Sequence, residues 1–399
     1  YLQGVGTGNE VVGNFVGTNT AGDDLGNAQI GIYLFDASGN TVGGTEDGAG
    51  NTVGFNGRSG ISVAGSSPGS ATDNVIQGNF AGTNAAGADL GNTLVGIIVQ
   101  NTSGTTVGGT DPAAGNVVRF NATGIVAYTD DLSTVDNAFL GNAVYDNDGL
   151  GIDLNEDGVT PNDPGDPDDG PNGLQNYPVL TSATASGGDV TVAFTLDSTP
   201  EAAFRVELFA SGEADPSGFG EGARFLGFTE VSTDASGDAS GSLLVSGVAE
   251  GEVVSATATP ILSTGPAVYG GTSEFSAALV VGLPPGSAIL NGSPGWYLMG
   301  SPTDGTAVDD LAALNLVAGV PGYYPDFGGS TLLTSYDGSD WVSSVGTGEV
   351  IESGRGFFWY FFDDVFTPPP STTFASSAVA FPVTLTAPGE VNTADADGT

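Results

Sequence analysis

Short runs of alternating apolar and polar residues recur along the chain, separated by glycine, asparagine, threonine and aspartate. The stretch VGIIVQNTSGTTVGG, from Val95 to Gly109, is typical: β-branched residues alternate for a few positions and then give way to turn residues. A period of two with frequent turn residues is characteristic of β-strands rather than of helices. The pattern therefore predicts an all-β protein.

A block of sequence occurs twice near the start of the chain. NFVGTNTAGDDLGN begins at Asn14, NFAGTNAAGADLGN begins at Asn79, and a degraded third start, GNAVYDND, contains Asn142. Three shorter units of strand and turn residues can be read within each block, and they must stack because none can bury an apolar face alone. We therefore expect a solenoid with asparagine and glycine at its corners, where stacked amides can hydrogen-bond from coil to coil.

These repeats resemble those of a known family. NVIQGNFAGTN, from Asn74 to Asn84, followed by VGIIVQNTSGTTVGG, is similar to the right-handed parallel β-helix repeats of large secreted bacterial surface proteins. The segment GLGIDLNEDGVTPNDPGDPDDGPNGLQNYPVL, from Gly149 to Leu180, is similar to the stretch that often closes such a helix and leads into sandwich domains. The resemblance implies a right-handed parallel β-helix with an acidic closing loop over residues 1–176, an extracellular location and no defined reaction.

The pattern changes near residue 177. Runs such as DVTVAFTL, FRVELFAS and GSLLVSGV alternate at spacings typical of an antiparallel sandwich. The ending VVSATATP, followed by TSEFSAALVV, looks like the last two strands of an immunoglobulin or fibronectin type III module. We expect an immunoglobulin-like β-sandwich over residues 177–283 and a second β-sandwich over residues 284–399. In the latter, GWYLMGSP and SGRGFFWYFFDD resemble segments near the C-termini of multidomain surface proteins of the Bacteroidota and Rhodothermota.

The composition removes most catalytic side chains. The 399 residues include no Cys and no His, and all five basic residues are arginines. These absences exclude a cysteine or histidine nucleophile, a Ser-His-Asp triad, a Schiff-base or P-loop lysine and the usual zinc sites. The formal net charge of −42 disfavours nucleic acid and anionic membrane surfaces as partners. It suits a saline habitat or a calcium-rich exterior, and no apolar run is long enough to span a membrane.

The sharpest local motif is D-x-N-x-D-G, which ends at Gly158. It matches the first half of an EF-hand-like loop, in which oxygens at positions 1, 3 and 5 converge on calcium and the glycine permits a sharp turn. Pro164 stands where a full loop has its bidentate glutamate, and nearby aspartates could substitute for it. The predicted calcium ligands are Asp153, Asn155, Asp157, Asp163 and Asp166. The alternative is an exposed acidic linker without a cation.

Six consecutive aromatic residues, from Phe357 to Phe362, stand in the last region. In a strand, three of them would point to each face, and only one face can line the core of a single sandwich. The second face is covered within the domain, contacts another subunit or stacks on a sugar. The predicted interface or glycan-binding residues are Trp341, Phe357, Trp359 and Phe361.

A parallel β-helix can carry a polysaccharide lyase or hydrolase, which needs paired carboxylates or a carboxylate with a base. The candidates in the solenoid are Asp23-Asp24, Asp130-Asp131, Arg58 and Arg119. Asp23-Asp24 aligns with Ala88-Asp89 in a corner loop, and the two arginines do not occupy equivalent repeat positions. We therefore expect a protein that is not an enzyme.

The expected function is structural or adhesive, as a stalk, a fibre subunit or a component of a cell-envelope layer on a bacterium. The expected partners are further copies of the chain or other surface proteins, with calcium stiffening the end of the solenoid. The first coil begins at Tyr1 without an amphipathic capping helix, which leaves an end where a neighbour could dock. The competing expectation is a protein that binds or degrades polysaccharides.

Overall fold

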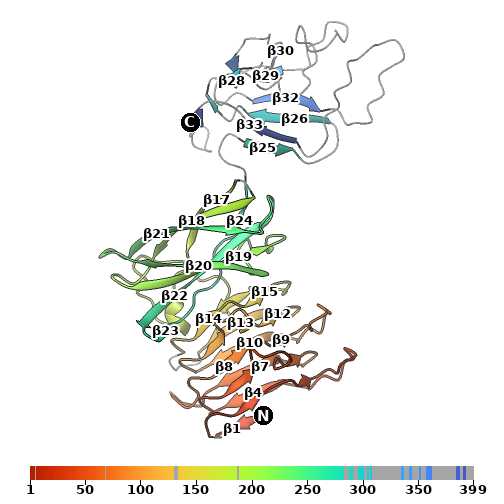
Figure 1. Ribbon diagram of the computed structural model, residues 1–399, viewed down its shortest axis with the longest axis vertical. Helices are drawn as coiled ribbons and strands as arrows, with labels where there is room; N and C mark the ends of the chain where they lie inside the picture. Colours follow the sequence, from red (N-terminus) through yellow and green to blue (C-terminus); the bar gives the residue numbers. More distant parts are fainter. Residues whose placement is uncertain are drawn as a thin grey trace. The chain divides into compact units, whose positions relative to one another are not determined.

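The computed structural model describes residues 1–282 apart from 5, 68, 130–133 and 187, and beyond them the backbone of a set of strands (Figure 1). The chain divides into two compact units, Tyr1–Gly282 and Leu283–Thr399. The described elements are β-strands and one short 3-10 helix, η1 (Pro171–Leu174), so the all-β prediction is confirmed. Among the described residues, no helix has the length and apolar character needed to cross a membrane.

The first part of the chain is a parallel β-helix of three sheets, as the repeats predict (Figure 1). The first sheet contains β1 (Leu2–Gln3), β4 (Ile32–Phe35), β7 (Ser59–Ala64), β10 (Val95–Gln100), β13 (Thr123–Tyr128) and β16 (Ile152–Leu154). The second contains β2 (Glu10–Val11), β5 (Thr41–Gly43), β8 (Val75–Gln77), β11 (Thr106–Gly108) and β14 (Ala138–Leu140). The third contains β3 (Phe15–Val16), β6 (Thr52–Val53), β9 (Phe80–Ala81), β12 (Val117–Val118) and β15 (Ala143–Val144). Each of five coils supplies one strand to each sheet, and β16 adds a sixth strand to the first sheet.

The sequence repeat corresponds to two coils, and its three units are not three stacked layers. The unit Asn74–Asn84 contains β8 and β9, Val95–Gly109 contains β10 and β11, and Gly115–Tyr128 contains β12 and β13. Each unit is thus a corner with a strand on either side. Three such units supply six strands, which is two turns of a three-sided helix.

The loop GTNAAGADLGN explains why the repeat spans two coils. In the first sheet, Ile61 aligns with Ile97, and Ile97 aligns with Ile125. The step along the chain is longer between the first pair because this loop lies between β9 and β10. The similar loop GTNTAGDDLGN follows β3, so it occurs in alternate coils.

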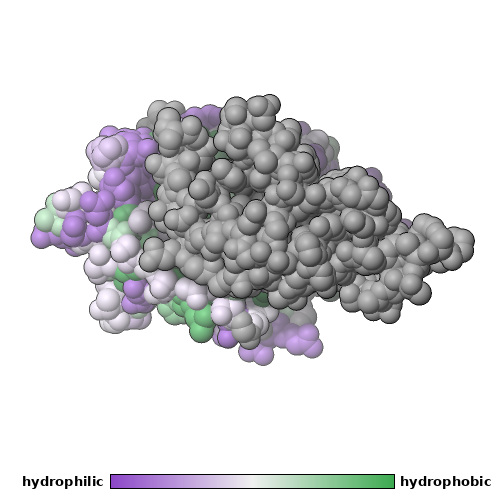
Figure 2. All heavy atoms as spheres, turned by 90° about the horizontal axis from the view of Figure 1, so that it is seen from above, coloured by the Kyte–Doolittle hydropathy of each residue, from purple (hydrophilic) through white to green (hydrophobic). Residues whose placement is uncertain are grey.

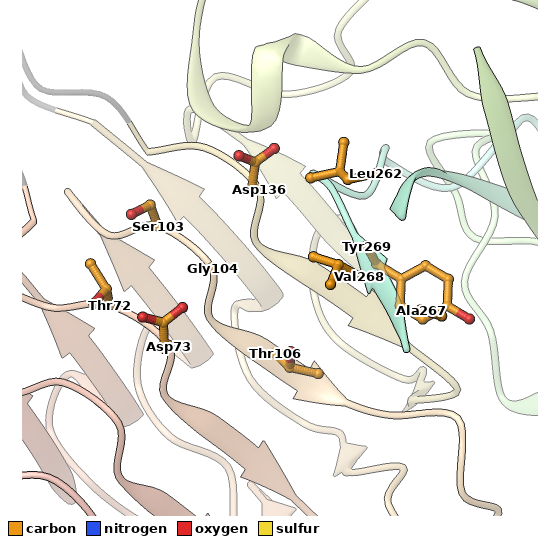
Figure 3. A pocket seen from close by; sticks show the side chains of 10 residues that line it. All are labelled: Thr72, Asp73, Ser103, Gly104, Thr106, Asp136, Leu262, Ala267, Val268 and Tyr269. Atoms are coloured by element: carbon orange, nitrogen blue, oxygen red, sulfur yellow. The ribbon is translucent and has the colours of Figure 1, made fainter. Parts of the chain in front are cut away.

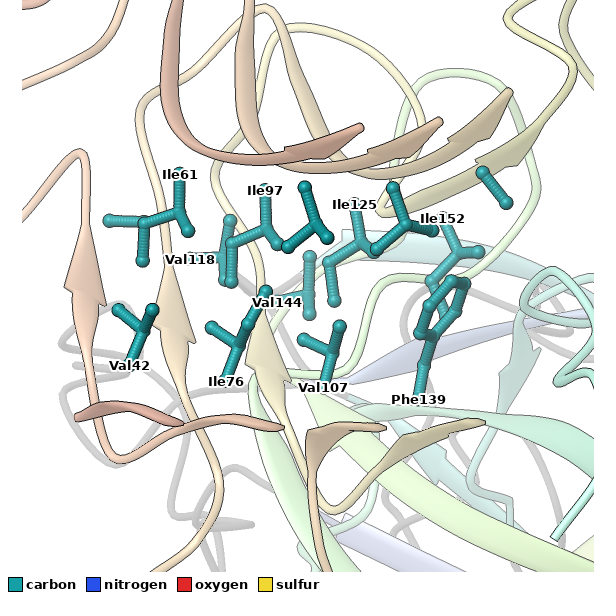
Figure 4. Packing of buried hydrophobic residues seen from close by; sticks show 14 of the residues in the cluster. Val42, Ile61, Ile76, Ile97, Val107, Val118, Ile125, Phe139, Val144 and Ile152 are labelled. Carbon is teal, nitrogen blue, oxygen red and sulfur yellow. The ribbon is translucent and has the colours of Figure 1, made fainter. Parts of the chain in front are cut away.

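The interior of the β-helix is a stack of β-branched side chains that continues from coil to coil (Figure 4). The three sheets each contribute a row of fully buried residues, among them Ile61, Ile97 and Ile125 from the first, Val42, Ile76 and Val107 from the second, and Val53, Val118 and Val144 from the third. Burying a valine or isoleucine side chain stabilises a fold by about 1.5–3 kcal/mol relative to leaving it exposed. This apolar column, repeated at each coil, holds the solenoid together.

Asparagine side chains form two unbroken ladders along the corners of the β-helix. One ladder contains Asn14, Asn51, Asn79, Asn116 and Asn142, and the other contains Asn27, Asn56, Asn92, Asn121 and Asn147. In each rung, one Oδ1 accepts both the backbone N–H and the Nδ2–H of the asparagine in the preceding coil. Asn79 N and Nδ2, for example, both lie 2.9 Å from Asn116 Oδ1. The stacked amides predicted from the sequence are therefore present.

Residues 179–280 form two antiparallel sheets, which we call the two-sheet region. One sheet contains β17 (Val179–Ser186), β18 (Asp189–Asp197) and β21 (Asp238–Ser246). The other contains β20 (Arg224–Ser232), β19 (Ala203–Ser211), β22 (Val253–Thr264) and β23 (Ala267–Tyr269), with β24 (Leu279–Val280) paired to β22. Phe194 of the first sheet and Leu208 of the second belong to one buried cluster, so the sheets pack face to face. An immunoglobulin-like topology stays a prediction.

The unit Leu283–Thr399 contains short antiparallel strands. They are β25 (Ser287–Leu290), β26 (Gly295–Gly300), β27 (Thr303–Asp304), β28 (Thr306–Ala307), β29 (Thr334–Tyr336), β30 (Trp341–Ser343), β31 (Val350–Ile351), β32 (Gly356–Phe361), β33 (Val383–Thr386) and β34 (Glu390–Val391). Trp341 lies in β30, and Phe357, Trp359 and Phe361 lie in β32, which pairs with β26 and β29. Their side chains lie outside what the structure describes, so their role as an interface or a glycan site stays a prediction. A second sandwich likewise stays a prediction.

The visible surface of the described residues is mostly hydrophilic or weakly polar, with smaller hydrophobic areas between (Figure 2). The formal net charge of −42 comes from 47 acidic residues against five arginines. Among the described residues most carboxylates are exposed, and the three buried ones, Asp153, Glu207 and Glu274, lie where the β-helix ends.

Candidate metal centre at the closed end of the solenoid

The asparagine ladders direct their N–H donors toward the C-terminal end of the β-helix, and Glu221 accepts the last donors of the ladder that ends at Asn147. Its Oε1 accepts the backbone N–H of Asn147 at 3.2 Å and the Nδ2–H at 3.4 Å. Its Oε2 accepts the backbone N–H of Asp146 at 2.8 Å. Glu221 thus occupies the place of the next asparagine, and an ionised carboxylate suits it because it only accepts hydrogen bonds.

The two-sheet region also meets the last strand of each sheet of the β-helix. Thr272 Oγ1 accepts the N–H of Phe139 in β14 at 2.8 Å, and Glu274 Oε1 accepts the N–H of Leu154 in β16 at 2.9 Å. Gly222 forms an antiparallel bridge with β15. Unpaired strand ends and exposed rungs are costly. The structure therefore closes the solenoid with the following region of the same chain instead of with a capping helix.

Two phenylalanines from the two-sheet region complete the apolar column. Phe209 of β19 and Phe275 are 2% and 3% exposed and belong to the core cluster of the β-helix. Their rings meet edge to face with centroids 5.2 Å apart. Gly151 and Gly222 permit this approach, since a Cβ on either would lie within about 3 Å of the Phe275 ring.

The outward face of β19 contributes a buried ion pair to the same junction. Arg205 and Glu207 are 3% and 0% exposed, and Arg205 Nε lies 2.7 Å from Glu207 Oε1. The other carboxylate oxygen accepts the N–H of Gly141 at 2.8 Å, and the guanidinium lies 3.5 Å from the centre of the Phe228 ring. Burial raises the pKa of Glu207, and Arg205 and the Gly141 N–H oppose that rise.

Burial also shifts the other carboxylates of the junction. Desolvation raises the pKa of Glu221 and of Glu274 to about 7, and the backbone N–H groups that each accepts oppose the shift. The charge of Asp153 adds to the rise in the pKa of Glu274, and desolvation raises the pKa of Asp153 itself to about 6. The junction therefore holds several carboxylates that titrate near neutral pH.

The structure separates the five predicted calcium ligands into two groups. Asp153 lies in β16 and is 8% exposed, and its Oδ1 is buried without a hydrogen-bond partner. The chain turns sharply after it, with positive φ at Asn155 and Glu156, and Asn155 Nδ2 donates to Asp157 Oδ2 at 3.0 Å. The backbone N–H groups of Asp157 and Gly158 lower the pKa of Asp153 and so face its carboxylate.

Asp163 and Asp166 come together with Asp168, which the prediction left out. Carboxylate oxygens of the three residues lie within 4.8 Å of one another. In the part of the chain that the structure describes, this is the one group of three or more acidic side chains close enough to share a metal ion. We call it the carboxylate triad.

Neighbouring residues hold the carboxylate triad in place. Asp166 Oδ1 accepts the N–H of Asn176 at 3.1 Å, and Asp166 Oδ2 accepts the Ser198 hydroxyl at 2.5 Å. Asn176 also accepts from the N–H of Asp163 at 3.0 Å. Asp197 Oδ1 accepts the N–H of Gly165 at 2.9 Å. The triad is therefore fastened to the end of β18 in the two-sheet region.

The carboxylate triad carries negative charge that no described residue balances. Desolvation raises the pKa of Asp166 to about 6, with Asp168 and Asp163 adding to the shift. Desolvation and Asp163 also raise the pKa of Asp168. Asp163 Oδ1 and Asp168 Oδ1 are buried without a hydrogen-bond donor. A buried carboxylate oxygen without a partner is costly, and an all-oxygen donor set matches calcium or magnesium better than zinc.

The residues weighed for catalysis make local contacts. Asp24 Oδ1 accepts the N–H of Gly26 at 3.0 Å, and Asp89 makes the same bond in the equivalent loop. Arg119 forms an ion pair with Asp146 and stacks on the rings of Phe120 and Tyr145. Asp130 and Asp131 lie outside the described residues. The corner-loop aspartates thus shape turns, and Arg119 joins adjacent coils.

Sequence reasoning did not find Asp168, Glu207, Glu221 or Glu274. Asp168 belongs to an acidic run in which spacing does not distinguish a ligand from a solvated side chain. The glutamates meet the β-helix across 66 to 120 residues of chain. No protein-family model matches the sequence, and no curated protein matches it.

Proposed function

We propose that this chain is a structural or adhesive protein of a bacterial surface, in which a parallel β-helix serves as a rigid spacer. The observation that carries the proposal is the unbroken chain of buried contacts from coil to coil and into the two-sheet region. The asparagine ladder passes directly to Glu221, and the apolar column passes to Phe209 and Phe275. A junction built in this way resists bending, because tilting it would break buried hydrogen bonds and open the core.

We also propose that calcium binds the carboxylate triad and stiffens the closing segment. Asp163, Asp166 and Asp168 would supply carboxylate oxygens, and water would complete the six to eight ligands that calcium takes. Two buried oxygens without donors and raised pKa values for Asp166 and Asp168 support a missing positive charge. Because the triad is fastened to β18, a bound ion would connect the closing segment to the two-sheet region.

Thermal unfolding followed by circular dichroism, in calcium and in chelator, tests this site. At a calcium concentration 100 times Kd, binding stabilises the folded state by about 2.7 kcal/mol, which raises Tm by roughly 5–10 °C for a unit of this size. Asp168→Asn should remove most of the rise. Asp169→Asn is the matched control, because Asp169 is adjacent, exposed and outside the triad. An unchanged Tm for the natural sequence would remove calcium from the proposal.

We propose further that the protein is secreted, works in a saline setting and associates with copies of itself or with other surface proteins. The acidic surface supports the first two points, since it keeps a protein hydrated and soluble when salt screens charge. Light scattering and electron microscopy of the full chain at high salt with calcium test self-association. Rods that join end to end would support it, and a monodisperse monomer at every concentration tested would refute it.

A further inference from the structure

A cavity of about 500 Å³ lies on the flank of the β-helix, beneath the β22–β23 hairpin (Figure 3). One wall consists of coil corners carrying Asp73, Gly104 and Asp136. The opposite wall belongs to the hairpin, where Val268 faces the corners and Leu262 lies near Asp136 (Figure 3). The remaining lining residues are Thr72, Ser103, Thr106, Ala267 and Tyr269. A cavity of this size can hold a small organic ligand.

The backbone of the corner explains which residues stand there. Asp73, Gly104 and Asp136 occupy equivalent positions in three successive coils, and their φ angles are 55°, 66° and 55°. The preceding coil has Gly39 at this position, with a φ of 64°. Only glycine, asparagine and aspartate adopt this left-handed conformation readily, so the corner restricts the choice of residue. Its alternation of glycine and aspartate leaves no side chain at Gly104, and the Asp73 carboxylate leans into this space, with Oδ1 2.7 Å from where a Cβ on Gly104 would lie.

The spacing of the carboxylates limits the ligand. Two rungs of a sheet separate Asp73 from Asp136, which places their Cα atoms roughly 10 Å apart. Both side chains are exposed, and no described group donates a hydrogen bond to either. Because the two residues start two rungs apart, a ligand with several donors matches them better than a single cation, which needs its oxygen ligands at about 2.3–2.6 Å. The ligand must carry hydrogen-bond donors at two separated positions, one for each carboxylate.

The other residues that line the cavity indicate which class of ligand carries these hydrogen-bond donors. The lining contains acceptor and hydroxyl groups but no arginine, so an anionic ligand would find no counter-charge. Val268 and Leu262 expose 49% and 54% of their surface, which offers an apolar wall beside the polar corner. A sugar has hydroxyl donors along its edges and C–H groups on its faces. It therefore matches a site with carboxylates on one side and aliphatic side chains on the other.

We propose that this cavity is a binding site for a neutral oligosaccharide. The carboxylates of Asp73 and Asp136 accept hydrogen bonds from sugar hydroxyls, and Val268 packs against a sugar face. The site is independent of the calcium triad and of the structural role proposed above. It would give the flank of the β-helix an adhesive surface. The hairpin that overhangs the site belongs to the two-sheet region.

Isothermal titration calorimetry with neutral hexasaccharides of glucose, mannose, galactose or xylose tests the proposal, in 0.5 M NaCl to screen simple charge attraction. The main variant is Gly104→Asn, which fills the gap, keeps the net charge and tolerates the positive φ. A Cβ at this position would lie 2.7 Å from Asp73 Oδ1, so the variant also displaces the Asp73 carboxylate, and the other neighbouring atoms lie 3.7 Å or more away. Gly39→Asn is the matched control, because it makes the same change at an equivalent corner that does not line the cavity. Val268→Ser removes the apolar wall at a half-exposed position.

We expect at least one hexasaccharide to bind, Gly104→Asn and Val268→Ser to weaken binding at least about tenfold, and Gly39→Asn to leave it unchanged. Circular dichroism verifies that each variant is folded. Binding by no hexasaccharide at 10 mM would overturn the proposal. So would equal binding by the natural sequence and Gly104→Asn. Spermidine, titrated at low salt, tests for a cationic ligand. If spermidine bound, lost its binding in Gly104→Asn, and no hexasaccharide bound, the site would belong to cationic ligands and the saccharide proposal would be wrong.

Discussion

Replacing Phe275 with alanine should uncouple the β-helix from the two-sheet region. The ring is 3% exposed, closes the apolar column and meets Phe209 edge to face at 5.2 Å. Truncating a buried phenylalanine costs about 3–5 kcal/mol, from lost apolar burial and from the cavity that remains. Gly151 and Gly222 approach the ring closely, and neither has a side chain with which to fill that cavity. We therefore expect a cost near the upper end of this range.

The assay is urea unfolding followed by far-ultraviolet circular dichroism, with hydrogen exchange to locate the change. All three tryptophans lie beyond residue 283, so tryptophan fluorescence reports on the C-terminal unit and serves as an internal reference. With a slope of about 3 kcal/mol per molar urea, the midpoint of the first unit should fall by about 1–1.7 M, and near the upper end of that range. Amides of β14, β15 and β16 should lose protection before those of β7 and β10, because the damage begins at the junction.

Phe15→Ala is the matched control. Phe15 is 48% exposed and lies near the other end of the β-helix, so the same truncation should lower the midpoint by less than half as much. Equal shifts for the two variants would refute the reasoning, because the cost would then come from losing a phenylalanine and not from opening the junction. A uniform loss of protection along all the coils would refute the local origin of the effect.

The remaining predictions concern charge and the ladders. Because the folded-state pKa of Glu274 is raised from its ordinary 4.5 to about 7, the folded state binds more protons than the unfolded state between these values, and the free energy of unfolding should fall as pH rises through this window. Urea midpoints at pH 5 and pH 8 measure the fall, and Glu274→Gln, which cannot titrate, should reduce it by on the order of 1–3 kcal/mol. Asn116→Ala should cost about 2–4 kcal/mol by urea unfolding, because it leaves the buried N–H donors of Asn79 without an acceptor. Asn14→Ala, in the same ladder but at its exposed end, should cost less than half as much, and equal costs would contradict a role for buried amide stacking.

The β-helix could be predicted because short stretches of sequence, repeated along the chain, determine the structure of a solenoid. Each rung repeats the same contacts, so Asn79 and Asn116 recur with the period of the coil, and the apolar alternation recurs with them. The number of coils per repeat was harder to predict. A unit such as Val95–Gly109 has the length of a short coil, but it is a corner with its two strands, and only the strand pairing reveals this.

The closed end could not be predicted in the same way. Glu221 and Glu274 each occur at a single place in the structure, where they accept hydrogen bonds from residues of the β-helix 74 to 120 positions earlier, and no repeat of the sequence marks them. The alternation of β19 was also misleading in one respect. In a strand with one solvated face, Arg205 and Glu207 would point to water, yet both are buried, and Glu207 accepts the N–H of Gly141 in the β-helix. The sequence pattern shows the alternation of β19, but it does not show which element covers the polar face of that strand.

The polarity of the ladders accounts for the chemistry of the junction. Within each ladder, every Oδ1 after the first accepts from the coil before it, so the final rung presents N–H donors, which Glu221 accepts at Asn147. Carboxylates are the strongest acceptors available to a chain with few other options, and Glu207, Glu221 and Glu274 occupy this end. Their burial costs free energy unless protons or cations compensate. The direction of the amide ladders therefore explains why acceptor carboxylates gather at this end of the solenoid, and the raised pKa values of Glu221 and Glu274 make it sensitive to pH.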